Sequence, residues 1–152
     1  MRAALIELFE AYDAAHRNPW TRRTHQLAIP LIAFHLVAMS DWIRVAQLPG
    51  GFVLTMAHPG MLAVSVWSLV MSPKLGVLMA AALAGCLALG AVTPWWIVVI
   101  AAIVGWTVQL LGHVLFEKNK PAFTENMVQT LVGPLFFLAE LTGDRRRSVA
   151  RR

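Results

Sequence analysis

Two long uncharged stretches dominate the hydrophobic pattern of this chain. Neither positions 45–73 nor positions 75–116 contain an Asp, Glu, Lys or Arg residue. A helix needs about 20 apolar residues to cross the hydrocarbon core of a bilayer. The two stretches therefore predict three membrane-spanning helices, at residues 52–71, 75–92 and 95–116.

The N-terminal residues 2–16 have the pattern of an amphipathic helix. Leu5, Leu8, Phe9 and Tyr12 recur at steps of three or four residues, so they share one helical face. Such a helix is expected to lie at the membrane surface.

The dipeptide Asn18-Pro19 interrupts this pattern and predicts the start of another helix. Asn is a favoured N-cap residue, and Pro suits the first helical turn. The second helix contains the apolar run 27–39, which makes it a further candidate span. His16 would then close the first helix, and His25 would lie about two turns into the second.

The last apolar segment, residues 127–141, is short and carries Gly133-Pro134 near its middle. It falls below the length of a comfortable span, so a re-entrant or interfacial helix is expected. The predicted fold is an all-α membrane protein with about four transmembrane helices, an N-terminal amphipathic helix and this C-terminal element. Residues 1–143 would form one integral-membrane domain, and residues 144–152 a basic cytoplasmic tail.

The composition agrees with a membrane protein and excludes an ordinary soluble domain. Hydrophobic residues make up 58% of the chain, charged residues 14%, and the mean hydropathy is +0.63. A net charge of +5 and a pI near 10.4 would suit a nucleic-acid-binding protein. The basic residues flank apolar segments, however, where they set topology and contact anionic lipid headgroups. Membrane lipid is therefore an expected partner, and nucleic acid is not.

The positions of the basic residues also predict an orientation. With four spans, Arg22 and Arg23, Lys74, Lys118 and the C-terminal arginines all face the cytoplasm, and Arg44 faces the other side. Both termini are then cytoplasmic, at the cytoplasmic membrane of a bacterium or the endoplasmic reticulum of a eukaryote. The sequence is compatible with a homo-oligomer.

This orientation places His16, His25, His113 and Glu117 on one side of the membrane at similar depth. Gln109, His113 and Glu117 are spaced i, i+4, i+8, so they share one face of a continuous helix. Imidazole and carboxylate ligands with open positions are typical of non-haem Fe(II) oxygenases, and zinc accepts the same ligands. The sequence therefore predicts a candidate metal site.

Other interpretations of these residues stay open at the level of sequence. Each histidine can instead cap a helix or bond a carbonyl, and Glu117 can be an ordinary solvated helix end. His35 and His58 lie deeper in predicted spans and are interpreted as helix–helix hydrogen bonds. A non-catalytic lipid-binding scaffold and a metal or proton transporter are therefore alternatives to an enzyme.

Two blocks of the chain, residues 9–32 and 104–140, carry motifs of fixed polar and small residues. The first block contains Tyr12-x-x-x-His16-x-Asn18-Pro19, then Arg22-x-x-His25 and Ile29-Pro30. The second contains Gly105-Trp106-x-x-Gln109-x-x-Gly112-His113-x-x-Phe116-Glu117-Lys118-x-x-Pro121-Ala122. Together they resemble the 2-hydroxy fatty acid dioxygenase family of fatty-acid α-oxidation.

This resemblance implies an Fe(II)-dependent dioxygenase of the membrane. It would take a long-chain 2-hydroxy fatty acid and O2, remove C1 and leave an acid one carbon shorter. His16, His25 and His113 match the essential histidines of the family, and Glu117 matches its motif carboxylate. The candidate substrate contacts are Tyr12, Asn18, Gln109, Lys118 and Lys120.

Overall fold

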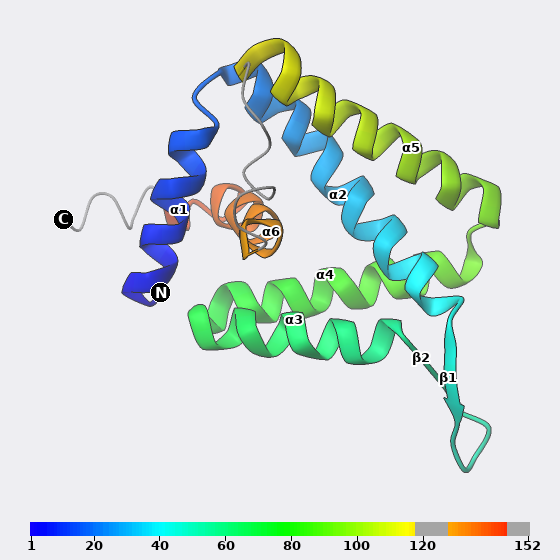
Figure 1. Ribbon diagram of the computed structural model, residues 1–152. Helices are drawn as coiled ribbons and strands as arrows, with labels where there is room; N and C mark the ends of the chain where they lie inside the picture. Colours follow the sequence, from blue (N-terminus) through cyan, green and yellow to red (C-terminus); the bar gives the residue numbers. More distant parts are fainter. Residues whose placement is uncertain (118–127, 146–152) are drawn as a thin grey trace.

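The computed structural model describes residues 1–117 and 128–145, which form helices and one small β-hairpin (Figure 1). In chain order the elements are α1 (Ala3–Ala15), α2 (Pro19–Asp41), β1 (Arg44–Gln47), β2 (Val53–Thr55), α3 (Ala57–Met71), α4 (Pro73–Val92), α5 (Trp95–Gly112), the π-helical turn η1 (His113–Glu117) and α6 (Val128–Leu141).

Helix α2 packs against helices on two sides. It runs along α5 on one side and contacts α3 and α4 on the other (Figure 1). Helices α3 and α4 lie antiparallel and side by side, while α6 contacts α1, α2 and α4. This arrangement brings the end of α1, the start of α2 and the end of α5 together at one corner of the molecule (Figure 1).

A buried hydrophobic cluster holds α1 against α6 and α4. Phe9 of α1 packs edge-on against Phe136 of α6, with 5.3 Å between the ring centroids. Leu5 of α1, Leu75 of α4 and Val132 of α6 are fully buried in the same cluster. Each such side chain contributes roughly 1.5–3 kcal/mol when removed from water. The cluster therefore fixes the direction in which the end of α1 points.

The expected helix boundaries around the first turn are confirmed. Helix α1 ends at Ala15 with His16 as its C-cap. The Asn18 side chain accepts a hydrogen bond from the Trp20 backbone amide at 2.9 Å and caps α2, in which Pro19 is the first residue. Thr93 and Pro94 likewise precede the start of α5.

The all-α prediction needs a correction between α2 and α3. Residues expected to begin the span 52–71 form an antiparallel hairpin instead, in which β1 pairs with β2. Gly50 and Gly51 have φ values of 85° and 83° and make its turn, a conformation in which side chains other than glycine are strained. Hydropathy could not separate this hairpin from a helix because its strands are uncharged apart from Arg44.

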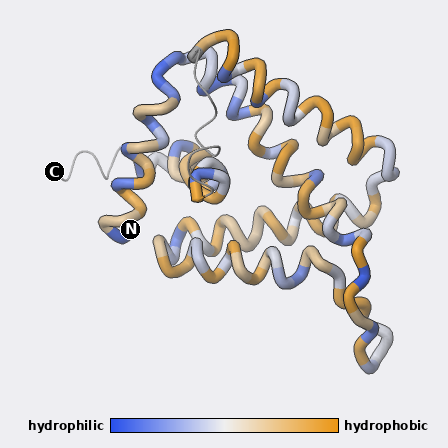
Figure 2. The backbone as a smooth tube through the Cα atoms, in the orientation of Figure 1, coloured by the Kyte–Doolittle hydropathy of each residue, from blue (hydrophilic) through white to orange (hydrophobic). Residues whose placement is uncertain are grey.

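Two helices of the described residues are long and apolar enough to cross a membrane. They are Pro73–Val92 and Trp95–Phe116. Figure 2 shows hydrophobic residues along most of both. Helix α3 has 15 residues because the hairpin uses the start of its predicted span, so four transmembrane helices are not confirmed.

Ion pairs attach the segment after α6 to the rest of the fold. Asp144 lies 2.6 Å from Lys74 of α4, and Arg145 lies 2.7 Å from Asp13 of α1 and 2.6 Å from Glu140 of α6. The first two residues of the predicted basic tail thus contact the helices. The remainder of that tail, residues 146–152, lies outside the described residues.

Candidate metal centre

Three histidines from three elements meet at the corner where α1, α2 and α5 converge. His16 follows α1, His25 lies in α2 and His113 begins η1. Their side chains are buried, with 3%, 3% and 2% of their surface exposed. One ligand nitrogen from each lies within 4.8 Å of the others. We call these residues the histidine triad.

Backbone carbonyls fix the tautomers of two members of the triad. The Nδ1–H group of His16 donates to the Tyr12 carbonyl at 2.6 Å, and that of His25 donates to the Thr21 carbonyl at 2.8 Å. A carbonyl can only accept, so Nδ1 carries the proton in both rings. In the neutral rings, Nε2 then carries a lone pair, as in metal-ligating histidines.

The Nε2 atom of His25 lies 3.0 Å from the Nε2 atom of His113 and 2.8 Å from the amide nitrogen of Gln109. Burial, followed by the proximity of His16 and His113, lowers the pKa of His25 to about 3. The ring is therefore neutral near pH 7, the state that a metal requires. Three buried imidazoles, two of which carry the Nε2 lone pair when neutral, fit a first-row transition metal.

Tyr12 supports the triad from α1. Its ring stacks on His16 with 4.1 Å between centroids and an interplanar angle of 22°. Burial, and then the negative charge of Glu140, raise the pKa of Tyr12, so its hydroxyl keeps its proton. Tyr12 was predicted as a substrate contact, and the structure places it beside the triad.

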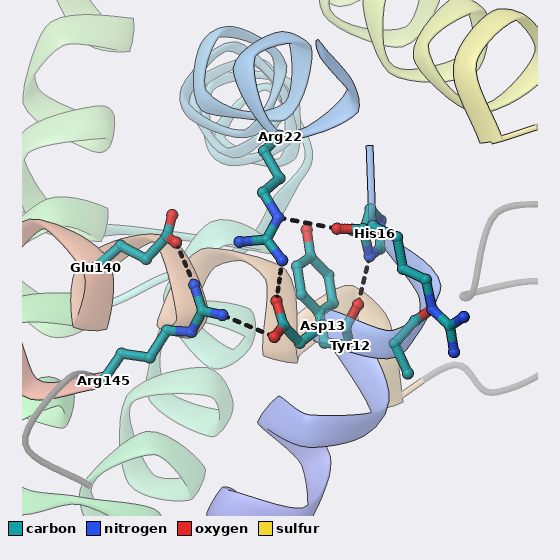
Figure 3. A network of polar contacts seen from close by, with 8 residues as sticks. Tyr12, Asp13, His16, Arg22, Glu140 and Arg145 are labelled. Carbon is teal, nitrogen blue, oxygen red and sulfur yellow. Dashed lines mark hydrogen bonds and ion pairs between the residues drawn. The ribbon is translucent and has the colours of Figure 1, made fainter. Parts of the chain in front are cut away.

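A chain of charged groups holds the backbone of His16 in place (Figure 3). Arg22 donates through Nε to the His16 carbonyl at 2.9 Å and pairs with Asp13 at 2.5 Å. Asp13 also pairs with Arg145, which in turn pairs with Glu140 (Figure 3). The network therefore joins the end of α1 to α2 and to the end of α6, and His16 lies at one end of it.

A close approach between α2 and α5 positions His113. A Cβ atom added to Gly112 would lie 2.4 Å from the Thr24 hydroxyl oxygen. The Thr21 hydroxyl also donates to the Gly112 carbonyl at 3.4 Å. Only glycine lets the end of α5 lie this close to α2, and this contact brings His113 to His25.

The helix predicted to continue through Phe116 changes to a π-helical turn at His113. Such turns recur at functional sites, and they alter the side-chain spacing that an α-helix would give. The expected alignment of Glu117 with His113 is therefore interrupted. The Glu117 side chain lies outside the described part of the structure, as do Lys118 and Lys120.

Asn18 and Gln109, both predicted substrate contacts, lie near the triad in different ways. Asn18 donates to the Phe116 carbonyl at 3.4 Å in addition to capping α2, so it joins η1 to α2. Gln109 lines a cavity that His16 and His113 also line.

The two remaining histidines lie outside the triad. His35 accepts a hydrogen bond from Trp106 at 3.2 Å, which confirms the expected helix–helix contact. For His58 that expectation is wrong, because its Nδ1 accepts from the Thr55 backbone amide at 3.1 Å, near the start of its own helix. The turn that follows β2 brings these two groups together.

Sequence reasoning gave no role to the cavity beside the triad or to Gln129, which lines it. The cavity has a volume of about 100 Å³ and lies between α2, α5 and α6. Gln129 is 9% exposed and lies in a mostly apolar part of α6. A lone buried amide in such a helix was the available signal, because polar groups in apolar segments are costly and tend to be functional.

Comparisons with known proteins agree with the resemblance. The family model described as 2-hydroxy-palmitic acid dioxygenase Mpo1-like matches residues 3–145. The chain is also 47% identical over 38 residues to the 2-hydroxy-palmitic acid dioxygenase MPO1 of Saccharomyces cerevisiae. That match covers 24% of this chain and 22% of the yeast protein. No solved structure matches the chain significantly.

Proposed function

Because this chain belongs to the 2-hydroxy-palmitic acid dioxygenase Mpo1-like family, we propose that it is an Fe(II)-dependent dioxygenase. Its substrate would be a long-chain 2-hydroxy fatty acid, and its product a fatty acid one carbon shorter. The observation that carries this proposal is the buried histidine triad, in which three imidazoles from separate elements converge.

His16, His25 and His113 would hold the iron. Ferrous iron with few protein ligands offers open positions to substrate and O2 and can donate electrons to O2. The carbonyls of Tyr12 and Thr21 orient two of the rings. Glu117 stays a predicted further ligand or an acceptor that orients His113.

The proposed reaction balances with O2 as the only oxidant. R-CH(OH)-COOH and O2 give R-COOH, CO2 and H2O. The bond between C1 and C2 breaks, C2 rises from the alcohol to the carboxylic acid level, and C1 leaves as CO2. Substrate oxidation supplies the four electrons that O2 accepts in this balance.

A membrane location suits this substrate because a long-chain hydroxy acid resides in the bilayer. The apolar helices α4 and α5 support such a location. Cytoplasmic termini, and steering of the substrate carboxylate by Lys118 and Lys120, remain predictions from the sequence.

The direct test incubates the purified chain with Fe(II), O2 and 2-hydroxy fatty acids of several lengths. We expect consumption of O2 and, by mass spectrometry, an acid one carbon shorter. His113→Ala should abolish both the product and bound iron. His35→Ala is the matched control, because His35 lies outside the triad, and it should keep both.

A lack of shortened acid from an iron-loaded, folded protein, across all lengths tested, would refute the proposed activity. Retention of iron and turnover by His113→Ala would refute the assignment of the site. Circular dichroism and gel filtration of each variant distinguish a lost ligand from a lost fold.

A further inference from the structure

The cavity beside the triad has a polar wall and an apolar wall. His16, His113, Gln109 and Gln129 supply polar groups to its wall. The side chains of Ile29, Ile32, Ala33 and Leu36, which follow one another along α2, supply an apolar wall. From Ile29 to Leu36 that wall extends for about 10 Å at the rise of an α-helix.

Two amide oxygens in the polar wall have no hydrogen-bond partner among the described residues. Within the part of the chain that the structure describes, neither Oε1 of Gln109 nor Oε1 of Gln129 has a hydrogen-bond partner, and both are buried. A buried polar atom without a partner lowers the stability of the folded chain. A ligand with a hydroxyl group in the cavity would remove this cost by donating to one of these oxygens.

The apolar wall of the cavity reaches the surface of the protein. Leu36 lines the cavity and is 46% exposed, whereas His16 and His113, which also line it, are buried. On the α6 side of the triad lies a different recess, lined by the charged residues Arg22, Glu140 and Arg145. An alkyl chain is therefore better placed along α2 than in this charged recess.

We propose that this cavity binds the 2-hydroxy acid with its head at Gln109 and Gln129 and its alkyl chain along α2 past Ala33 to the opening at Leu36. The 2-hydroxyl group donates to an amide oxygen, which selects hydroxy acids over unsubstituted ones. The part of the alkyl chain that extends beyond Leu36 lies outside the protein. This binding mode rests on the proposed function for its substrate class.

Equilibrium binding without O2 tests the head of the site. The iron-loaded protein is titrated with 2-hydroxypalmitic acid and with palmitic acid under anaerobic conditions. Gln129→Leu should weaken binding of the hydroxy acid about 10-fold, the worth of one hydrogen bond, and leave palmitic acid unchanged. Gln47→Leu, an exposed glutamine of the hairpin, is the matched control and should change neither affinity.

A chain-length series tests the tail of the site. Ala33→Phe fills the apolar part of the cavity, so it should weaken binding of 2-hydroxypalmitic acid and spare 2-hydroxy acids of a few carbons. Ala102→Phe is the matched control, because Ala102 is half-buried on α5 and does not line this cavity. Iron content, measured in every variant, should equal that of the unmodified protein.

The binding mode is wrong if Gln129→Leu and Ala33→Phe both bind 2-hydroxypalmitic acid as tightly as the unmodified protein does. If both variants also turn over normally, the proposed function stands and only the binding mode is refuted. If the hydroxy acid binds as expected but no shortened acid forms in O2, the binding mode stands and the proposed reaction falls.

Discussion

His25 and His113 bring their Nε2 atoms to within 3.0 Å of each other although 88 positions separate them in the sequence. Two imidazoles in this arrangement cannot both be charged, because like charges at this distance repel strongly in a buried site. The proximity of the two rings therefore makes the stability of the metal-free folded protein depend on pH.

Acid should destabilise the metal-free protein, and His25 should account for part of the loss. The pKa of His25 is about 3 in the folded chain and 6.5 in the reference state. Between these values the unfolded chain binds a proton that the folded chain does not, so stability falls as pH falls below about 6.5. The loss between pH 6.5 and 5 is about 2 kcal/mol at most.

Thermal unfolding in detergent at pH 5, 6 and 7 measures this dependence. His25→Asn removes the titrating ring and should flatten the profile. Gln47→Ala, at an exposed residue of β1 that does not titrate, serves as the control and should leave the slope as it is. An unchanged slope in His25→Asn would refute the role of this ring.

Replacement of Gly112 by Ala should separate α5 from α2. The new Cβ would lie 2.4 Å from the hydroxyl oxygen of Thr24 and 3.3 Å from its Cβ. Overpacking of this kind costs typically 1–3 kcal/mol, and the shift of α5 should also lower metal affinity. Thermal unfolding and metal titration measure the two effects.

Two further variants make the Gly112 test specific. Adding Thr24→Ala removes the nearest clashing atom and should restore part of the loss. Gly60→Ala changes a helical glycine whose new Cβ meets nothing within 4 Å, so it should be tolerated. Full metal affinity and stability in Gly112→Ala alone would show that the close approach is dispensable.

Arg22 should act as a positioning residue for His16. Its Nε atom donates to the His16 carbonyl while its other nitrogen pairs with Asp13. Lys keeps the charge but lacks the planar fork that makes both contacts. Arg22→Lys should therefore lower metal affinity about 10-fold, within the range known for groups that orient ligands.

Arg23→Lys provides the matched comparison for Arg22→Lys. Arg23 is exposed, and its guanidinium lies over the Trp20 ring with 4.8 Å to the centroid. Arg23→Lys should keep the metal affinity of the unmodified protein. Equal affinities in both variants, measured by competition with a metal chelator, would argue against the positioning role of Arg22.

A charge on the outer surface of α5 should hinder membrane insertion. Ile103 is 62% exposed near the middle of the candidate span Trp95–Phe116. If that surface faces lipid, Ile103→Arg costs about 2.5–3.5 kcal/mol in insertion. We expect less protein in the membrane fraction after alkaline extraction.

Val45→Arg is the control for that substitution. Val45 is 53% exposed but lies in the hairpin, where an added charge should be tolerated. Normal membrane recovery of Ile103→Arg would mean that this face of α5 does not contact lipid.

Much of the local structure followed from the sequence because it depends on neighbouring residues. The helix boundary at His16 and the cap at Asn18 come from nearby groups. The apolar character of α4 and α5 follows from composition. The hairpin and the short α3 were not predicted, because hydropathy gives no information about backbone conformation such as the positive φ values of Gly50 and Gly51.

For the candidate site, the sequence by itself predicted that His16, His25, His113 and Glu117 lie on one side of the membrane, and the structure brings the three histidines together. Only the tertiary structure decided how they meet. The contact of Gly112 with Thr24, the turn at His113 and the cavity lined by α2, α5 and α6 depend on distances between elements. The periodicity of a sequence predicts which face of a helix a side chain occupies. The distances between helices are set by packing.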